Sequence, residues 1–116
     1  MAPTVLVVDD EPVIVAMMAD FLTEEGYRVR CAADGRAALH DVERAPPDLI
    51  VSDVTMPGLD GVSLVRRLRQ RGFAMPVILM SAVHPGRNVA GTRFLPKPFD
   101  LAQVAALVAQ TLAGAG

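Results

Sequence analysis

Five short apolar runs alternate with segments of helical periodicity, and this alternation constrains the fold more than any other feature of the chain. Strands are expected over residues 4–8, 27–32, 48–53, 76–80 and 92–96. Between and after these runs, apolar residues recur every three or four positions, which is typical of helices that bury one face. Strands that alternate with helices predict a parallel sheet covered on both faces and joined by right-handed crossovers.

Local signals mark where the helices begin and end. Pro12 suits the first turn of a helix, and Gly26 suits the position just after a last turn. Asp60 is a candidate N-cap, and Asp100 pairs with Gln103 as a capping box. Helices are therefore expected over residues 12–25 and 35–44, from about residue 61, and over residues 100–113.

The fold class that these elements favour is α/β, a flavodoxin-like doubly wound sheet of five parallel strands in the order 2-1-3-4-5. In that order the first and third strands lie side by side at the switch point, where open α/β sheets bind ligands. A chain of 116 residues can bury the core of one domain without metal or disulfide. We therefore expect a single domain over residues 1–116.

Polar side chains stand at the ends of four of the five expected strands. Asp9 and Asp10 follow the first, Asp53 ends the third, Ser81 follows the fourth and Lys97 follows the fifth. Because carboxyl ends of parallel strands meet at one edge of a sheet, we expect these groups to converge. Three carboxylates in one place repel one another, so at least one pKa should be raised. Oxygen ligands without nearby His or Cys favour Mg²⁺ as the cofactor.

Such a site could carry out transfer of a phosphoryl group to a carboxylate. Asp53 would be the nucleophile, while Lys97, Ser81 and Mg²⁺ would stabilise the three equatorial phosphoryl oxygens. The competing interpretation is a structural metal site in which Lys97 is only an internal counter-ion.

Composition argues against several other functions. A net charge of −2 offers no electrostatic case for direct binding of nucleic acid, and one tyrosine with no tryptophan makes a base-stacking platform improbable. No apolar run approaches the ~20 residues that span a bilayer, and no export signal opens the chain, so membrane insertion is not expected. The single cysteine, Cys31, cannot form an internal disulfide and falls in an apolar-looking strand, which fits a cytoplasmic compartment.

Four motifs in this order resemble the receiver domain of two-component response regulators. They are the segments VLVVDDEP ending at Pro12, DVTMPGLDG from Asp53, SA from Ser81, and FLPKPF from Phe94. The resemblance implies a signalling domain rather than an enzyme with an external substrate. Such a domain catalyses its own aspartyl phosphorylation and dephosphorylation, with a sensor histidine kinase or a histidine phosphotransfer domain as donor.

The resemblance also implies roles for individual residues. Asp53 would be the phosphoacceptor. The Mg²⁺ site would comprise Asp10, Asp53 and the Thr55 carbonyl, with Asp9 orienting a metal-bound water. Ser81 and Lys97 would contact the phosphoryl group, and Ser81 and Phe94 would form the switch. The Lys97-Pro98 peptide bond would be cis, as is usual in this family.

A partner surface is expected beside the acidic loop. Ile14 and Met17 lie at the edge of the apolar arc of the first helix, and with Pro98 and Phe99 they would form a patch that docks the helical phosphodonor domain of the kinase. A plain core position is the competing interpretation for Met17. A downstream protein partner, or an effector domain that this sequence lacks, would receive the signal.

Two other classes of protein have a related arrangement. A flavodoxin-like electron carrier needs a Ser/Thr/Gly-rich phosphate loop after the first strand, but here that loop is acidic and would repel a flavin phosphate. A small aspartate-nucleophile phosphatase of the haloacid-dehalogenase kind needs a second Asp two residues after the nucleophile, where this chain has Thr55.

The segment between Ser81 and Lys97 departs from the family pattern. Once the strand at 92–96 is removed, only residues 82–91 remain, and they include Pro85, Gly86 and Gly91. Because Pro and Gly disfavour helix, the fourth helix of the family should be short, irregular or absent. We expect phosphorylation to order or shift this segment, with His84 as a candidate sensor.

Overall fold

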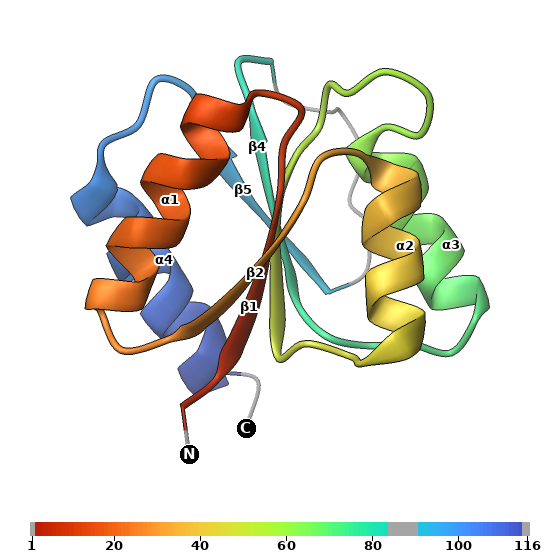
Figure 1. Cartoon of the computed structure of the whole chain (residues 1–116), viewed down its shortest axis with the longest axis horizontal. Coiled ribbons are helices and arrows are strands. Elements are labelled where there is room, and N and C mark those ends of the chain that lie inside the picture. Colours follow the sequence, from red (N-terminus) through yellow and green to blue (C-terminus); the bar gives the residue numbers. More distant parts are fainter. Residues whose placement is uncertain (1, 84–90, 115–116) are drawn as a thin grey trace.

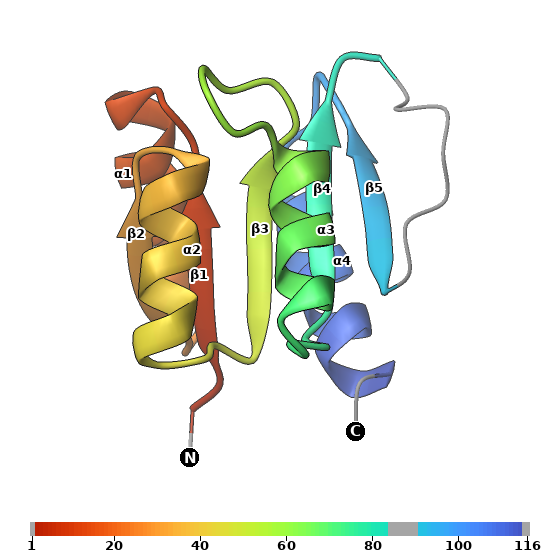
Figure 2. The ribbon, with the colours of Figure 1, turned by 90° about the vertical axis from the view of Figure 1, so that its right-hand side faces the viewer.

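The computed structural model describes residues 2–83 and 91–114 and contains five parallel strands in the order β2-β1-β3-β4-β5. The strands are β1 (Thr4–Val8), β2 (Arg28–Ala32), β3 (Leu49–Asp53), β4 (Val77–Ser81) and β5 (Thr92–Pro96). Their arrowheads all point the same way in Figure 2. The predicted strand order is therefore confirmed, and the bounds of β2, β3 and β4 differ from expectation by one residue.

Two helices cover each face of the sheet. They are α1 (Pro12–Glu24) and α4 (Leu101–Gly114) on one face, and α2 (Gly35–Arg44) and α3 (Gly61–Gln70) on the other. Figure 1 shows the sheet nearly edge-on between these two layers. Each layer encloses its own apolar cluster, one centred on Leu6, Ile50 and Leu64 and the other on Val7, Met18 and Val51. The doubly wound architecture expected from the alternation is confirmed.

The helix ends follow the local signals in the sequence. Ser63 N–H donates to the Asp60 carboxylate at 2.7 Å, which confirms the N-cap of α3. Asp100 N–H donates to Gln103 Oε1 and Gln103 N–H donates to Asp100 Oδ1, both at 2.8 Å, so the expected capping box is present. Gly26 follows α1 with a φ of +99°, which suits glycine at a C′ position.

The central strand β3 carries Asp53 to the site. All five of its residues are buried, between β1 on one side and β4 on the other. Burying a Leu, Val or Ile side chain stabilises a fold by about 1.5–3 kcal/mol. Asp53, the last residue of β3, is therefore held by a strand that is packed on both faces and hydrogen-bonded along both edges.

The connection from β4 to β5 is short. Ten residues separate Ser81 from Thr92, and in the part of the chain that the structure describes no helix lies between these two strands. The expectation of a short or absent fourth helix, and the role considered for His84, rest largely on residues 84–90, which lie outside the described residues.

Cys31 differs from its expected environment. The sequence placed it with Val29 on the apolar face of a strand, but in the structure its side chain is exposed. It lies at the edge strand β2, beside a shallow cavity that it shares with Val15 and Ala16 of α1. Among the described residues, no helix is both long and apolar enough to cross a bilayer.

Candidate functional site

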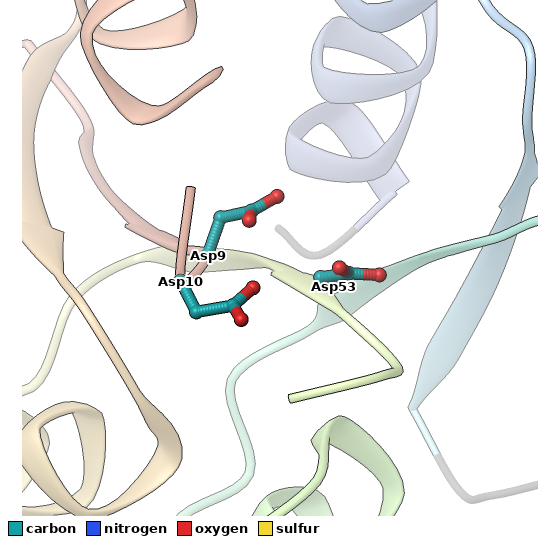
Figure 3. Close-up of side chains that lie close together, drawn as sticks. All are labelled: Asp9, Asp10 and Asp53. Carbon is teal, nitrogen blue, oxygen red and sulfur yellow. The ribbon is translucent and has the colours of Figure 1, made fainter. Parts of the chain in front are cut away.

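Three carboxylates meet at the carboxyl ends of β1 and β3. Parallel pairing places Val8 beside Ser52, so the residues that follow, Asp9 and Asp53, emerge next to each other. One carboxylate oxygen from each of Asp9, Asp10 and Asp53 lies within 4.8 Å of the others. Figure 3 shows the Asp9 and Asp10 side chains beside that of Asp53. Asp9 and Asp53 are buried and Asp10 is exposed, so the cluster opens to solvent on one side.

The electrostatics of this cluster favour a cation. Burial raises the pKa of the Asp9 carboxyl, and the nearby negative charge of Asp53 adds to the effect. Two interactions oppose the increase in this pKa: the Glu11 N–H, which donates to Asp9 Oδ1 at 2.9 Å, and the positive charge of Lys97. A raised pKa is expected from the sequence, where repulsion between the carboxylates is the cause. The direction is confirmed, but burial is the larger cause.

The oxygen atoms of this cluster suit a hard divalent ion. All three side chains offer carboxylate oxygens, and an ion among them would offset the cost of burying two negative charges. A group of two buried acids and one exposed acid also leaves room for water or a phosphate oxygen on the open side. This is the ligand environment that Mg²⁺ accepts more readily than Zn²⁺ or Cu²⁺.

A lysine completes the charged part of the site. Lys97 follows β5, and its Nζ lies 3.3 Å from Asp53 Oδ1. The Lys97 N–H donates to the Ser81 carbonyl at 2.9 Å, so the lysine backbone is fixed to the end of β4. The Lys97-Pro98 peptide bond is cis, as the resemblance implied. Thr55 N–H also donates to Asp53 Oδ1, at 3.4 Å.

The two candidate switch residues lie on neighbouring strands. Ser81 ends β4 and is buried, and its hydroxyl donates to the Val83 carbonyl at 2.6 Å while accepting the Val83 N–H at 3.1 Å. Phe94 lies in the middle of β5, opposite Leu79 of β4, and is half-buried. Ser81 therefore stands at the same rim as the carboxylates, and Phe94 lies three residues before Lys97 on the adjoining strand.

A groove adjoins the acidic cluster. Its volume is about 390 Å³, and it is lined by Asp9, Glu11, Ile14, Met17, Ala82, Lys97, Pro98 and Phe99. All four residues expected in the partner patch line it. Met17 is 42% exposed, so it is a surface residue and not a core position. We call this cavity the docking groove.

Sequence reasoning missed one residue that shapes the site. A Cβ at Gly61 would lie 2.5 Å from the Asp53 carbonyl oxygen, and the Gly61 N–H donates to the Val54 carbonyl at 2.9 Å. The first turn of α3 therefore approaches the backbone of the acidic strand as closely as glycine allows. The available signal was a glycine directly after the N-cap Asp60.

The sheet order defines a doubly wound α/β domain of the flavodoxin-like class, and the three carboxylates lie at its switch point. The family model of the response regulator receiver domain matches residues 5–109. The chain belongs to this family and is a receiver domain of two-component response regulators.

Curated relatives agree with this family. The chain is 36% identical over 107 residues to the probable transcriptional regulatory protein TcrX of Mycobacterium tuberculosis, covering 87% of this chain and 46% of that protein. It is 38% identical over 117 residues to the response regulator GtcR of Aneurinibacillus migulanus, covering 95% and 48%. The chain spans about half the length of these relatives.

Solved structures agree as well. The receiver domain of the Francisella response regulator 1452 superposes with a TM-score of 0.89 at 32% identity, covering 98% of this chain and 99% of that one. The receiver domain of the hybrid histidine kinase CckA gives a TM-score of 0.82 at 38% identity, covering 94% and 98%. These likenesses favour the receiver domain over the electron carrier and the phosphatase that were weighed from the sequence.

Proposed function

We propose that Asp53 is the phosphoacceptor of this receiver domain. The observation that carries the proposal is the position of Asp53. It ends a fully buried strand, lies among the carboxylates of Asp9 and Asp10, and has Lys97 Nζ at 3.3 Å. A carboxylate that is both fixed in place and next to a positive charge suits nucleophilic attack on phosphorus.

The transfer needs few chemical steps. An oxygen of Asp53 forms a bond to phosphorus while the bond from phosphorus to the imidazole nitrogen of a phosphohistidine breaks. The electron pair of the broken bond stays with the imidazole, which then takes a proton from solvent. Lys97 and Ser81 are proposed to donate to the phosphoryl oxygens, which carry the negative charge. Phe94 is the proposed aromatic partner of Ser81 in the resulting switch.

The cofactor of this transfer is proposed to be Mg²⁺, held by Asp10, Asp53 and the Thr55 carbonyl, with Asp9 orienting a metal-bound water. The support is the cluster of three carboxylates, together with a pKa of Asp9 that is raised first by burial and then by the charge of Asp53. When bound, Mg²⁺ supplies positive charge that offsets the approach of an anionic phosphoryl group to three acids.

The donor is proposed to be a sensor histidine kinase or a histidine phosphotransfer domain that seats a helix in the docking groove. Ile14, Met17, Pro98 and Phe99 offer apolar contacts there, and Asp9 and Lys97 form the end nearest the acceptor. A cytoplasmic location fits such a donor. The signal would pass to a downstream protein or to an effector domain outside this sequence.

Labelling with acetyl phosphate tests the acceptor directly. Intact mass after incubation with Mg²⁺ should show one phosphoryl adduct, and the adduct should be absent in EDTA and in Asp53→Asn. An adduct that persists in Asp53→Asn, or that forms equally well in EDTA, would refute the assignment.

A further inference from the structure

A hydroxyl group lies in the apolar interior directly beside the proposed phosphoacceptor. Ser52 precedes Asp53 on β3 and is fully buried. Its partners in the sheet are Val8 of β1 and Leu79 of β4, both of which belong to the apolar cluster that α2 and α3 cover. A buried hydroxyl costs free energy unless it forms a hydrogen bond. The Ser52 hydroxyl donates to the Asp53 carbonyl at 2.9 Å, which offsets this cost.

The carbonyl that Ser52 contacts belongs to a peptide group that is also bonded on its other side. The Asp53 C=O and the Val54 N–H form one planar trans peptide and point in opposite directions. The Val54 N–H donates to the Met80 carbonyl of β4 at 2.9 Å, while the Asp53 carbonyl accepts from Ser52. The plane of this peptide therefore cannot rotate without the loss of at least one hydrogen bond.

The next peptide joins this backbone to the acceptor carboxylate. Its carbonyl, that of Val54, accepts the Gly61 N–H at 2.9 Å, and its N–H, that of Thr55, donates to Asp53 Oδ1 at 3.4 Å. The Asp53 carboxylate and the backbone that leads to the Thr55 carbonyl, a proposed ligand of Mg²⁺, are thus linked to the same two peptides. A rotation of the Asp53–Val54 peptide would displace both ligands.

We propose that Ser52 is a positioning residue for the acceptor site. Its hydroxyl fixes the Asp53–Val54 peptide, and through that peptide it sets the direction of the Asp53 carboxylate and of the Thr55 carbonyl. Ser52 acts through the backbone and does not itself contact Mg²⁺ or the phosphoryl group. Because such ligands must lie within about 0.5 Å of their productive positions, loss of the Ser52 hydrogen bond should weaken the metal site. This inference rests on the proposed phosphorylation of Asp53 with Mg²⁺.

The competing explanation is that Ser52 only fills a small space in the core. Two variants separate the explanations, because they differ in volume but both lack a strong donor. Ser52→Ala removes the hydroxyl and leaves a small void, whereas Ser52→Cys fills the space with a weak S–H donor. If Ser52 serves packing alone, Ser52→Cys should match the parent. If the hydroxyl positions the acceptor, both variants should be impaired.

The first measurement is the affinity for Mg²⁺ alone, from the shifts of the Val54 and Thr55 amide NMR signals during a titration. The dissociation constant should rise about fivefold in both Ser52 variants, as expected for the loss of one hydrogen bond. The matched control is Thr111→Val in α4, because the Thr111 hydroxyl is also buried and donates to a backbone carbonyl, that of Leu107, at 2.6 Å. Thr111→Val should bind Mg²⁺ like the parent.

Amide hydrogen exchange reports on the peptide itself, without metal. In both Ser52 variants the Val54 N–H should exchange faster, on the order of fivefold, because the peptide that carries it has lost its second hydrogen bond. The Ile50 N–H, which donates to the Pro76 carbonyl at 3.1 Å near the start of β3, should keep its exchange rate and serves as the control.

Several results would overturn the positioning role. They are a parent-like affinity for Mg²⁺ in either Ser52 variant, an unchanged exchange rate at Val54, or an equal loss of affinity in Thr111→Val. Faster exchange at Val54 with a parent-like affinity would also count against the role, because the hydrogen bond would then order the backbone without affecting the site.

Measurements on the parent separate failure of this inference from failure of the proposed function. If the parent binds Mg²⁺ and labels at Asp53 with acetyl phosphate, and Ser52→Ala does so equally well, the role of Ser52 is wrong and the acceptor assignment stands. If Mg²⁺ does not shift the Val54 and Thr55 signals of the parent, or if labelling persists in Asp53→Asn, the proposed function itself is wrong.

Discussion

Lys97 Nζ lies 3.3 Å from Asp53 Oδ1, although the two residues are 44 positions apart in the sequence. Asp53 ends the buried strand β3, and Lys97 follows the edge strand β5. The Asp53 side chain is 8% exposed and that of Lys97 is 36% exposed. The carboxylate is thus withdrawn from solvent, and the lysine reaches it from the rim, where it can also meet an incoming phosphoryl group.

Removing the lysine should slow phosphorylation far more than it disturbs the fold. Lys97→Ala should lower the rate of labelling by acetyl phosphate by about 100-fold, because one charged donor to the phosphoryl oxygens is lost. Lys97→Arg should retain part of the rate, since it keeps the charge with a different geometry. Arg93→Ala, at an exposed position of β5, the strand that leads to Lys97, is the matched control and should label normally. Labelling of Lys97→Ala at the parent rate would contradict the role.

The Asp9 carboxyl should limit stability when no cation is present. Its pKa is raised in the folded protein by burial and then by the charge of Asp53. A carboxyl that binds its proton more tightly when folded costs stability once it is ionised, that is, at pH values above its raised pKa. The cost disappears as the pH falls through that pKa toward the ordinary value of 3.8.

Asp9→Asn should therefore raise the midpoint of thermal unfolding by a few degrees at pH 7 in EDTA. The stability advantage of Asp9→Asn should shrink as the pH falls from 7 through the raised pKa of Asp9. Mg²⁺ should stabilise the parent more than the variant. Thermal unfolding across a pH series, with and without Mg²⁺, gives both comparisons. A variant less stable than the parent at pH 7 in EDTA would count against a burial cost at Asp9.

Gly61 should tolerate no side chain. A Cβ there would lie 2.5 Å from the Asp53 carbonyl oxygen, so Gly61→Ala must displace either α3 or the end of β3. Overpacking of this kind costs about 1–3 kcal/mol, and the shifted Asp53 should label more slowly. Gly114→Ala, whose Cβ would meet only Arg93 Nη2 at 3.8 Å, is the control. Urea unfolding that finds both variants equally stable would refute the argument.

Met17 should matter for the donor and not for the acceptor chemistry. Met17→Ala should slow transfer from a phosphorylated histidine kinase by about tenfold and leave labelling by acetyl phosphate unchanged. The matched control is Val13→Ala, because Val13 lies on the same helix at 77% exposure but does not line the docking groove. An equal loss of rate for Met17→Ala in both assays would mean that the substitution disturbs the packing of the core and not the docking of the donor.

Local signals predicted much of this structure. Caps at Asp60 and Asp100 depend only on neighbours three residues away, and a parallel sheet follows from the alternation of strands with helices over most of the chain. The convergence of Asp9, Asp10 and Asp53 follows in turn from parallel pairing of β1 with β3. These features could therefore be predicted from the sequence.

Features that depend on contacts between elements distant in the sequence could not be predicted from the sequence. Helical periodicity shows which residues of a helix form its apolar arc. It does not show how far the elements packed against the helix cover that arc, so the sequence could not decide whether Met17 is buried. Exposure of Cys31 depends on the place of β2 at the edge of the sheet, and the turn between Ser81 and Val83 depends on one serine rotamer. The close approach of Gly61 depends on how α3 is seated on β3.

Chemical mapping of the phosphorylated residue tests the central claim most directly. The protein is labelled with phosphoramidate and Mg²⁺, a donor that shares the phosphorus–nitrogen bond of phosphohistidine, and is then reduced with borohydride, which converts an aspartyl phosphate to homoserine. Peptide mass spectrometry should find homoserine at position 53, and none after labelling in EDTA. Homoserine at position 9 or 10, or a stable phosphate on a hydroxyl residue, would contradict the assignment of Asp53.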